Sequence, residues 1–122
     1  MPILEIEVVV VGDETTEGLS ALLADAAAAV FQSPPGNTWV RLRELRSENY
    51  AENGGGPPQG TRPVFVRVLL ATLPAQSELA TQAAALAAAV ARACGGTADD
   101  VHVVYEPPAA GRIAFGGTLL ER

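Results

Sequence analysis

The sequence predicts an α/β fold (α+β in some classifications), in which two tandem βαβ units form a four-stranded mixed sheet with two helices on one face. Apolar residues alternate with a period of two where strands are expected, and they recur at helical spacing between those segments. The order strand, helix, strand occurs twice, over about residues 2–54 and 63–117. Right-handed crossovers place both helices on the same side. We therefore expect a single domain over residues 1–122.

The first unit begins with alternating β-branched and acidic residues, which is typical of a strand with two unlike faces. An amphipathic helix follows, for which Asp13 or Thr15 is available as a cap. Glycine and proline later interrupt regular structure. The expected elements are a strand over 2–11, a helix from Leu19 to a stop at 33–36, a strand over 38–46 and an irregular segment over 54–60.

The second unit repeats this order with an alanine-rich helix that Gly95 and Gly96 are expected to end. Its expected elements are a strand over 63–73, a helix over 79–90 and a strand over 101–106. The order and spacing of elements, more than residue identity, favour an internal repeat. The two halves align Pro2 with Pro63, Trp39 with His102, Tyr50 with Ile113, and residues 53–54 with 116–117.

The alternation along the strands separates a core face from an open face. The apolar set expected beneath the helices is Leu4, Ile6, Val8, Val10, Val40, Leu42, Val64, Val66, Val68, Leu70, Val101, Val103 and Tyr105. On the other face, Trp39, Phe65 and Leu69 would be exposed beside charges of both signs, a pattern typical of an interface or ligand site. We expect other copies of the chain to cover this face. The ion pairs expected there join Glu5, Glu7 and Glu106 to Arg41, Arg43 and Arg67.

The composition excludes several classes of function. The formal net charge is -6, and all eight basic residues are arginine, so general nucleic-acid binding is not expected. A single cysteine, Cys94, and a single histidine, His102, exclude an intrachain disulfide and the usual zinc ligand sets. No apolar run approaches the length of a membrane span, and no signal peptide is evident. We expect a soluble cytoplasmic protein without metal, membrane or nucleic-acid partners.

Pro2 is the sharpest chemical feature of the sequence. Initiator methionine is usually removed before a small residue such as proline, and Pro2 would then carry a free secondary amine, which is a base and a nucleophile. Apolar neighbours such as Ile3 and Ile113 would lower the pKa of this amine towards the working range. Pro63 has no such role because Arg62 acylates its nitrogen. The alternative is that Pro2 only starts an edge strand, where proline is tolerated.

The chain resembles the tautomerase superfamily, which includes 4-oxalocrotonate tautomerase and macrophage migration inhibitory factor. The resemblance rests on the opening Met1-Pro2-Ile3, on the double βαβ plan, and on the tail over 101–117, which matches the last strand and hairpin of the family without gaps. It implies a homotrimer that needs no cofactor. It also implies that Pro2 acts as general base or acid on a small keto-enol substrate, and that neighbouring subunits complete each site.

The resemblance also implies further site residues. His102 takes the position of a family residue that contacts substrate from the final strand, with Trp39 as its partner in the first half. Ile113 and Tyr50 take the position of the apolar wall. Two departures from the family matter. The residues at 12–13 replace an arginine of 4-oxalocrotonate tautomerase, and Ala71 and Pro74 replace the paired arginines of the dehalogenases.

Four arginines are available to bind a carboxylate or enolate: Arg41, Arg43, Arg67 and Arg112. For the first three, pairing with glutamates of the sheet is the alternative, and for Arg112 it is a solvated hairpin charge. Taken with this family resemblance, the residues lead us to expect an isomerase, a keto-enol tautomerase acting on a 2-oxo or enol acid. The rival hypotheses are a non-enzymatic trimeric binding or structural module on the same scaffold, and a hydratase or decarboxylase of the same superfamily.

Overall fold

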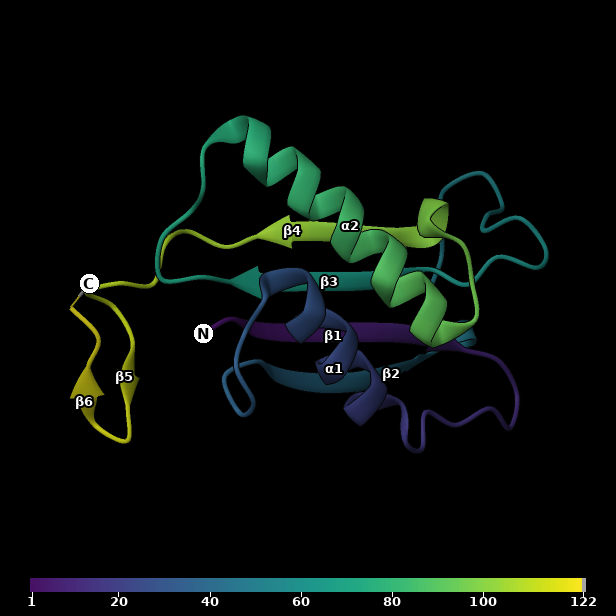
Figure 1. Ribbon diagram of the computed structural model, residues 1–122. Helices are drawn as coiled ribbons and strands as arrows, with labels where there is room; N and C mark the ends of the chain where they lie inside the picture. Colours follow the sequence, from purple (N-terminus) through teal and green to yellow (C-terminus); the bar gives the residue numbers. More distant parts are fainter. Residues whose placement is uncertain (122) are drawn as a thin grey trace.

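Four strands pair into one sheet in the computed structural model, which describes residues 1–121. The two helices lie together on one face of this sheet (Figure 1). The main elements are β1 (Ile3–Val10), α1 (Leu19–Phe31), β2 (Trp39–Arg46), β3 (Val64–Leu69), α2 (Gln76–Cys94) and β4 (Val101–Tyr105). Short 3-10 turns occupy Ser47–Asn49 and Ala98–Asp100, and the strands β5 (Ala114–Phe115) and β6 (Thr118–Leu119) form a separate hairpin.

The sheet is mixed, and its strand order is β2-β1-β3-β4. β1 runs parallel to β2, β3 runs parallel to β4, and the central pair β1 and β3 is antiparallel. Each parallel pair encloses one helix in the chain, which is the βαβ arrangement. The predicted fold class, two βαβ units with both helices on one face, is confirmed.

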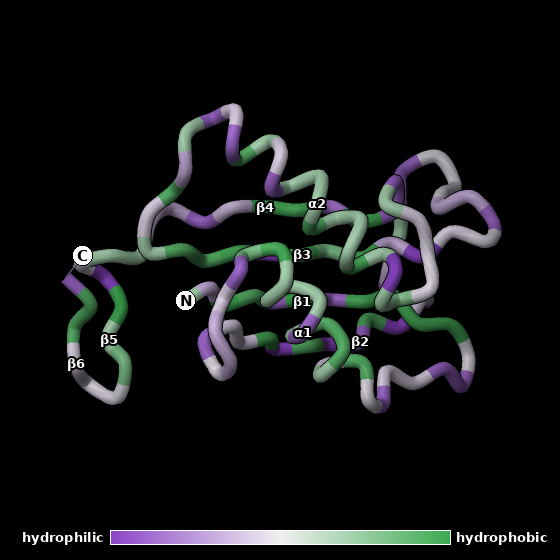
Figure 2. The backbone as a smooth tube through the Cα atoms, viewed as in Figure 1, coloured by the Kyte–Doolittle hydropathy of each residue, from purple (hydrophilic) through white to green (hydrophobic). Residues whose placement is uncertain are grey.

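The core lies between the sheet and the two helices. It contains the alternate side chains of β1 and β3. Hydrophobic residues recur along both of these strands (Figure 2). Leu23 and Ala27 of α1 and Leu86 and Val90 of α2 close it from the other side. The apolar set predicted for this face is buried or packs against the core, with Val40, Leu42, Val103 and Tyr105 only partly buried.

The second unit departs from the expected boundaries. β3 ends at Leu69 rather than at 73, because the carbonyl groups of Leu70 and Ala71 accept hydrogen bonds from the tail after β4 instead of continuing the strand. α2 is longer than predicted at both ends. Gly95 ends it in the left-handed conformation (φ 74°), as expected, and its N–H donates back to the last turn.

The start of α1 also differs from the prediction. Neither Asp13 nor Thr15 caps the helix; Gly18 occupies the cap position with a φ of 78° and makes no side-chain bond. The turn before it is fixed from outside, since the backbone N–H and hydroxyl of Thr16 donate to Glu44 of β2 at 2.7 and 2.8 Å. A carboxylate from a neighbouring strand thus takes the place of a local cap.

The two ends of the sheet carry different segments. The N-terminus and the β5–β6 hairpin lie at one end, and the loop between β2 and β3 lies at the other (Figure 1).

The two halves of the chain do not match residue for residue as the sequence alignment predicted. Ile3, after Pro2, faces away from the helices, whereas Val64, after Pro63, is buried in the core. Within residues 1–121, no helix is long and apolar enough to cross a membrane.

Candidate active site

Pro2 is buried at the start of the central strand β1. Its carbonyl accepts a hydrogen bond from the backbone N–H of Trp39 at 3.1 Å, and the next residue, Ile3, lies opposite both Trp39 and Leu69 in the sheet. The alternative in which Pro2 starts an edge strand does not hold, because β1 has a neighbour on each side. The surroundings of Pro2 are therefore formed by β2, β3 and the segments that pack on them.

The hairpin reaches this end of the sheet through an aromatic contact. Phe115 of β5 meets Trp39 edge-on, with ring centroids 5.5 Å apart and planes at 89°. The indole N–H of Trp39 donates to the carbonyl of Gly36 at 2.9 Å, which fixes the ring. Phe115 was not among the residues selected from the sequence. Its aromatic side chain, two positions after Ile113 in the hairpin, is the sequence feature that could have identified it.

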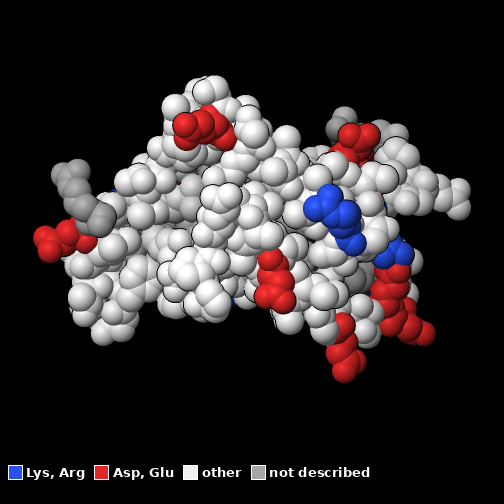
Figure 3. All heavy atoms as spheres, in the orientation of Figure 1, with Lys and Arg blue, Asp and Glu red and all other residues white. Residues whose placement is uncertain are grey.

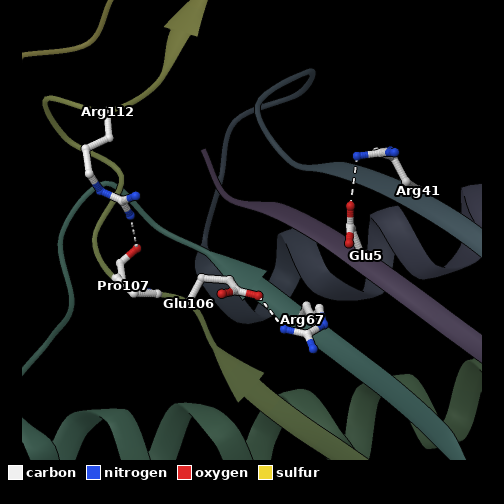
Figure 4. Close-up of polar contacts among 6 residues, drawn as sticks. All are labelled: Glu5, Arg41, Arg67, Glu106, Pro107 and Arg112. Carbon is white, nitrogen blue, oxygen red and sulfur yellow. Dashed lines mark hydrogen bonds and ion pairs between the residues drawn. The ribbon is translucent and has the colours of Figure 1, made fainter.

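Arg112 holds the base of the hairpin. Its Nη2 donates to the carbonyl of Pro107 at 3.0 Å (Figure 4). Its Nε and Nη2 also donate to the carbonyl of Pro108, at 3.0 and 2.9 Å. These bonds use one edge of the guanidinium on the backbone. The structure thus gives Arg112 a positioning role, and its predicted contact with substrate stays a prediction.

Two of the other candidate arginines are paired with carboxylates on the open face. Arg41 bonds to Glu5 at 2.8 Å and Arg67 to Glu106 at 2.6 Å, as the sequence predicted (Figure 4). Arg43 lies opposite Glu7 in the register of β1 and β2, but among residues 1–121 the expected ion pair between them is not formed. Both observed pairs are exposed, so each holds its arginine only weakly.

An aromatic cluster occupies the other end of the open face. The Phe65 ring lies 5.9 Å from that of Tyr50 and 5.4 Å from that of His102, between centroids. These contacts leave Phe65 half-buried rather than exposed as predicted. The three rings help to line a pocket of about 330 Å³ together with Glu7, Val66, Arg67 and Val104.

The hydroxyl of Tyr50 donates to Glu52 at 2.7 Å. This hydrogen bond to a carboxylate raises the pKa of Tyr50 above its ordinary value, and the nearby negative charge acts in the same direction. Glu52 was not among the predicted site residues, although it lies only two positions after one of them.

The single chain does not bring all predicted site residues together. Pro2 and Glu7 are separated by five residues of extended chain, roughly 16 Å, and Glu7 is in register with Phe65, which is next to His102. Pro2, Trp39, Arg112 and Ile113 belong to one end of the molecule, whereas Tyr50 and His102 belong to the other. Within residues 1–121, no group of three or more His, Cys, Asp or Glu side chains is placed to hold a metal ion.

Cys94 lies apart from both ends of this surface. It lines a separate pocket of about 580 Å³ between the end of α2 and the loop before β3. Burial raises the pKa of its thiol, so the side chain stays protonated at neutral pH. This is the behaviour expected of a small packed cysteine.

Comparisons of the fold with solved structures find full-length likenesses. MIF2 of Leishmania major has a TM-score of 0.62 and 22% identity, and the match covers 98% of this chain and 97% of that one. A fused 4-OT that forms a symmetric trimer has a TM-score of 0.71 and 21% identity over 96% and 95% of the two chains. The chain has the tautomerase superfamily fold.

The tautomerase fold also occurs in FG41 malonate semialdehyde decarboxylase, with a TM-score of 0.70, 18% identity and coverage of 93% of this chain and 88% of that one. No protein-family model and no curated protein matches the sequence. The similarity to these proteins is therefore one of backbone arrangement. Any activity of this chain depends on the residues that it places on the shared fold.

Proposed function

We propose that the protein is a keto-enol tautomerase whose general base and acid is the amino-terminal nitrogen of Pro2. The observation that supports this is the place of Pro2: it is buried at the start of a central strand of a tautomerase fold, and its carbonyl is hydrogen-bonded to Trp39, whose ring contacts Phe115 of the hairpin. In the full chain Met1 acylates Pro2. The proposal therefore requires that Met1 be removed.

The proposed reaction moves one proton and leaves the substrate otherwise intact. The free Pro2 nitrogen takes a proton from the carbon next to a carbonyl group, the electron pair shifts to the carbonyl oxygen, and the proton is returned at another atom. Desolvation disfavours the charged form of a buried amine and so favours the free base. Nearby cations stabilise the negative oxygen of the intermediate.

We propose that a homotrimer completes each site. Tyr50 and His102 lie too far from Pro2 of the same chain to share one small substrate with it. Contact between the two ends of different copies would bring them together, and a fused 4-OT with this fold forms a symmetric trimer. Each chain has one Pro2, which gives at most three active sites per trimer.

The substrate that we propose is a small 2-oxo or enol acid. Arg41, Arg67 and Arg112 already have partners on this surface, so few cations are free to bind two carboxylates at once. The aromatic side chains at both ends of the open face suit an apolar substrate body. Phenylpyruvate, which has one carboxylate and one ring, is the natural first probe.

The first test is the intact mass of the purified, untagged protein together with phenylpyruvate enol-keto exchange on the same sample. We expect a mass lacking one methionine and measurable turnover. A processed amino terminus without exchange of phenylpyruvate or a small aliphatic 2-oxo acid would sink the proposal.

Replacement of the base gives the mechanistic test. Pro2→Ala is expected to lower the exchange rate by about 100-fold or more, in the range that a positioned general base contributes, while the fold is retained by circular dichroism. Pro63→Ala is the matched control, since it removes a buried proline whose nitrogen is acylated. Equal rates for Pro2→Ala and wild type would contradict the role of Pro2.

A non-enzymatic trimeric binding module is the second candidate. It is favoured if Met1 stays in place, because an amide nitrogen is not a base. Full mass with no turnover would support it. A hydratase or decarboxylase is the enzymatic variant, and the decarboxylase of the same fold motivates a parallel assay for loss of carbon dioxide from a small 3-oxo acid.

A further inference from the structure

In the segment between β2 and β3, both the backbone and the carboxylate of Glu52 make specific contacts. Tyr50 donates its hydroxyl proton to Glu52 at 2.7 Å, and Glu52 forms an isolated antiparallel bridge with Gly56. Two constraints thus act on Glu52: its backbone is tied to Gly56, and one of its carboxylate oxygens is tied to the tyrosine.

The Glu52 carboxylate occupies the space that a side chain at position 56 would need. A Cβ atom at position 56 would overlap Oε1 of Glu52 and would lie 2.9 Å from its Cδ and 3.0 Å from its Cβ. No side chain larger than hydrogen fits there unless Glu52 moves. The backbone of Gly56 is not left-handed, so a side chain at position 56 would act by displacing the exposed Glu52 carboxylate and not by straining the φ angle.

Tyr50 in turn faces the pocket at the end of the open sheet. Its ring is tilted against Phe65, which also contacts His102. The titratable or charged residues that share the pocket lining with Tyr50 are Glu7, Arg67 and His102. Arg67 is paired with Glu106, and the Tyr50 hydroxyl is bonded to Glu52.

We propose that Glu52, clamped against Gly56, is a positioning residue that fixes Tyr50 with its hydroxyl proton turned away from the pocket. This inference rests on the proposed function, because Tyr50 is taken to contact substrate in the assembled site. A phenol has one proton to donate. When that proton is committed to Glu52, the Tyr50 oxygen presents lone pairs to the pocket, and it accepts a hydrogen bond from a substrate hydroxyl such as that of an enol.

The first measurement is the titration of Tyr50, followed by tyrosinate absorbance. The chain has two tyrosines, and Tyr105 is the internal reference, because its hydroxyl bonds to Gln82 at 2.9 Å and burial raises its pKa. Removing the carboxylate with Glu52→Ala, or displacing it with Gly56→Ala, is expected to lower the pKa of Tyr50 towards its ordinary value and leave Tyr105 unchanged. Tyr50→Phe assigns the two transitions.

The second measurement is the kinetics of phenylpyruvate exchange. Tyr50→Phe, Glu52→Ala and Gly56→Ala are each expected to raise KM by about three- to tenfold with kcat nearly unchanged, as for a lost hydrogen bond that binds substrate and transition state equally. Glu52→Gln keeps an acceptor oxygen in place and is expected to restore a KM close to that of wild type. Glu48→Gln, a nearby exposed carboxylate that pairs with Arg46, is the matched control.

The proposal is overturned if the pKa of Tyr50 is the same in Glu52→Ala and Gly56→Ala as in wild type. It is also overturned if Tyr50→Phe raises KM and the other two variants do not, or if Tyr50→Phe itself has no effect on KM. Failure of the tautomerase proposal has a different signature, since Pro2→Ala would then leave the exchange rate unchanged whatever Tyr50 does. The titration of Tyr50 tests its hydrogen bond to Glu52 without depending on turnover.

Discussion

At the scale of single residues, the candidate site depends on a few side chains that the backbone places with little freedom. Pro2 is buried between two strands, and Trp39 lies opposite the residue that follows it. Trp39 remains 51% exposed in the single chain although its ring is bonded to Gly36 and stacked edge-on against Phe115. This aromatic pair connects the hairpin to the Pro2 end of the sheet.

The contact between Trp39 and Phe115 is expected to contribute to stability. An edge-to-face aromatic pair contributes about 1 kcal/mol beyond burial, so Trp39→Leu and Phe115→Leu should show a coupling of that order in the free energy of unfolding, measured by urea denaturation of both single variants and the double variant. Phe65→Leu combined with Phe115→Leu is the control, and additive effects are expected there because the two rings lie at opposite ends of the sheet. Additive effects for Trp39 and Phe115 would show that the contact does not hold the hairpin.

At the scale of elements, α1 depends on a strand rather than on its own sequence for the turn that precedes it. Glu44 of β2 accepts two hydrogen bonds from Thr16, and these bonds lower the pKa of the Glu44 carboxyl below its ordinary value, with a smaller contribution from Arg46. The bonds join the loop before α1 to the neighbouring edge of the sheet, and they are strongest when the carboxylate is ionised.

The pH dependence of stability follows from this lowered pKa. The contribution of Glu44 is fully present above the ordinary carboxyl pKa and is lost as the pH falls through the lower value in the folded state. Glu44→Gln is therefore expected to be less stable than wild type at pH 7, and the difference should shrink as the solution becomes acidic, as measured by urea unfolding across a pH series. Glu17→Gln, an exposed carboxylate beside the start of α1, should show no such convergence. A difference that is constant with pH would contradict the role assigned to Glu44.

At the scale of the whole molecule, the two faces of the sheet differ in what they leave exposed. The helix-bearing face shows few charged side chains (Figure 3) and carries Leu22, which is 59% exposed. The open face carries the paired charges of Glu5, Arg41, Arg67 and Glu106 together with Val104, which is 51% exposed. We propose that the open face is the surface buried in the proposed homotrimer.

The matched pair Val104→Asp and Leu22→Asp tests this assignment. Both substitutions place a carboxylate at an exposed apolar position, but on opposite faces. Sedimentation equilibrium should give a trimer for wild type and for Leu22→Asp, and smaller species for Val104→Asp, because an unpaired charge buried in an interface is costly. A monomeric wild type, or a trimer lost only in Leu22→Asp, would refute the assignment.

The local pattern of the sequence determined the elements and their layers. Period-2 alternation predicted the strands and separated core from open face, helical spacing predicted α1 and α2, and Gly95 was correctly expected to end α2. Two of the three predicted ion pairs also formed, because parallel pairing within a βαβ unit and the alternation of side chains bring those residues together.

The tertiary structure decided what depends on contacts between distant segments. It ended β3 at Leu69 because the tail after β4 takes the next carbonyls, and it supplied Glu44 in place of a local cap for α1. It also placed Tyr50 and His102 at the end of the sheet away from Pro2, and packed Glu52 against Gly56. Periodicity reports only the face on which a residue lies. Strand order, register and the path of a loop decide which residue of that face it meets, and these are set by the packing of the whole chain.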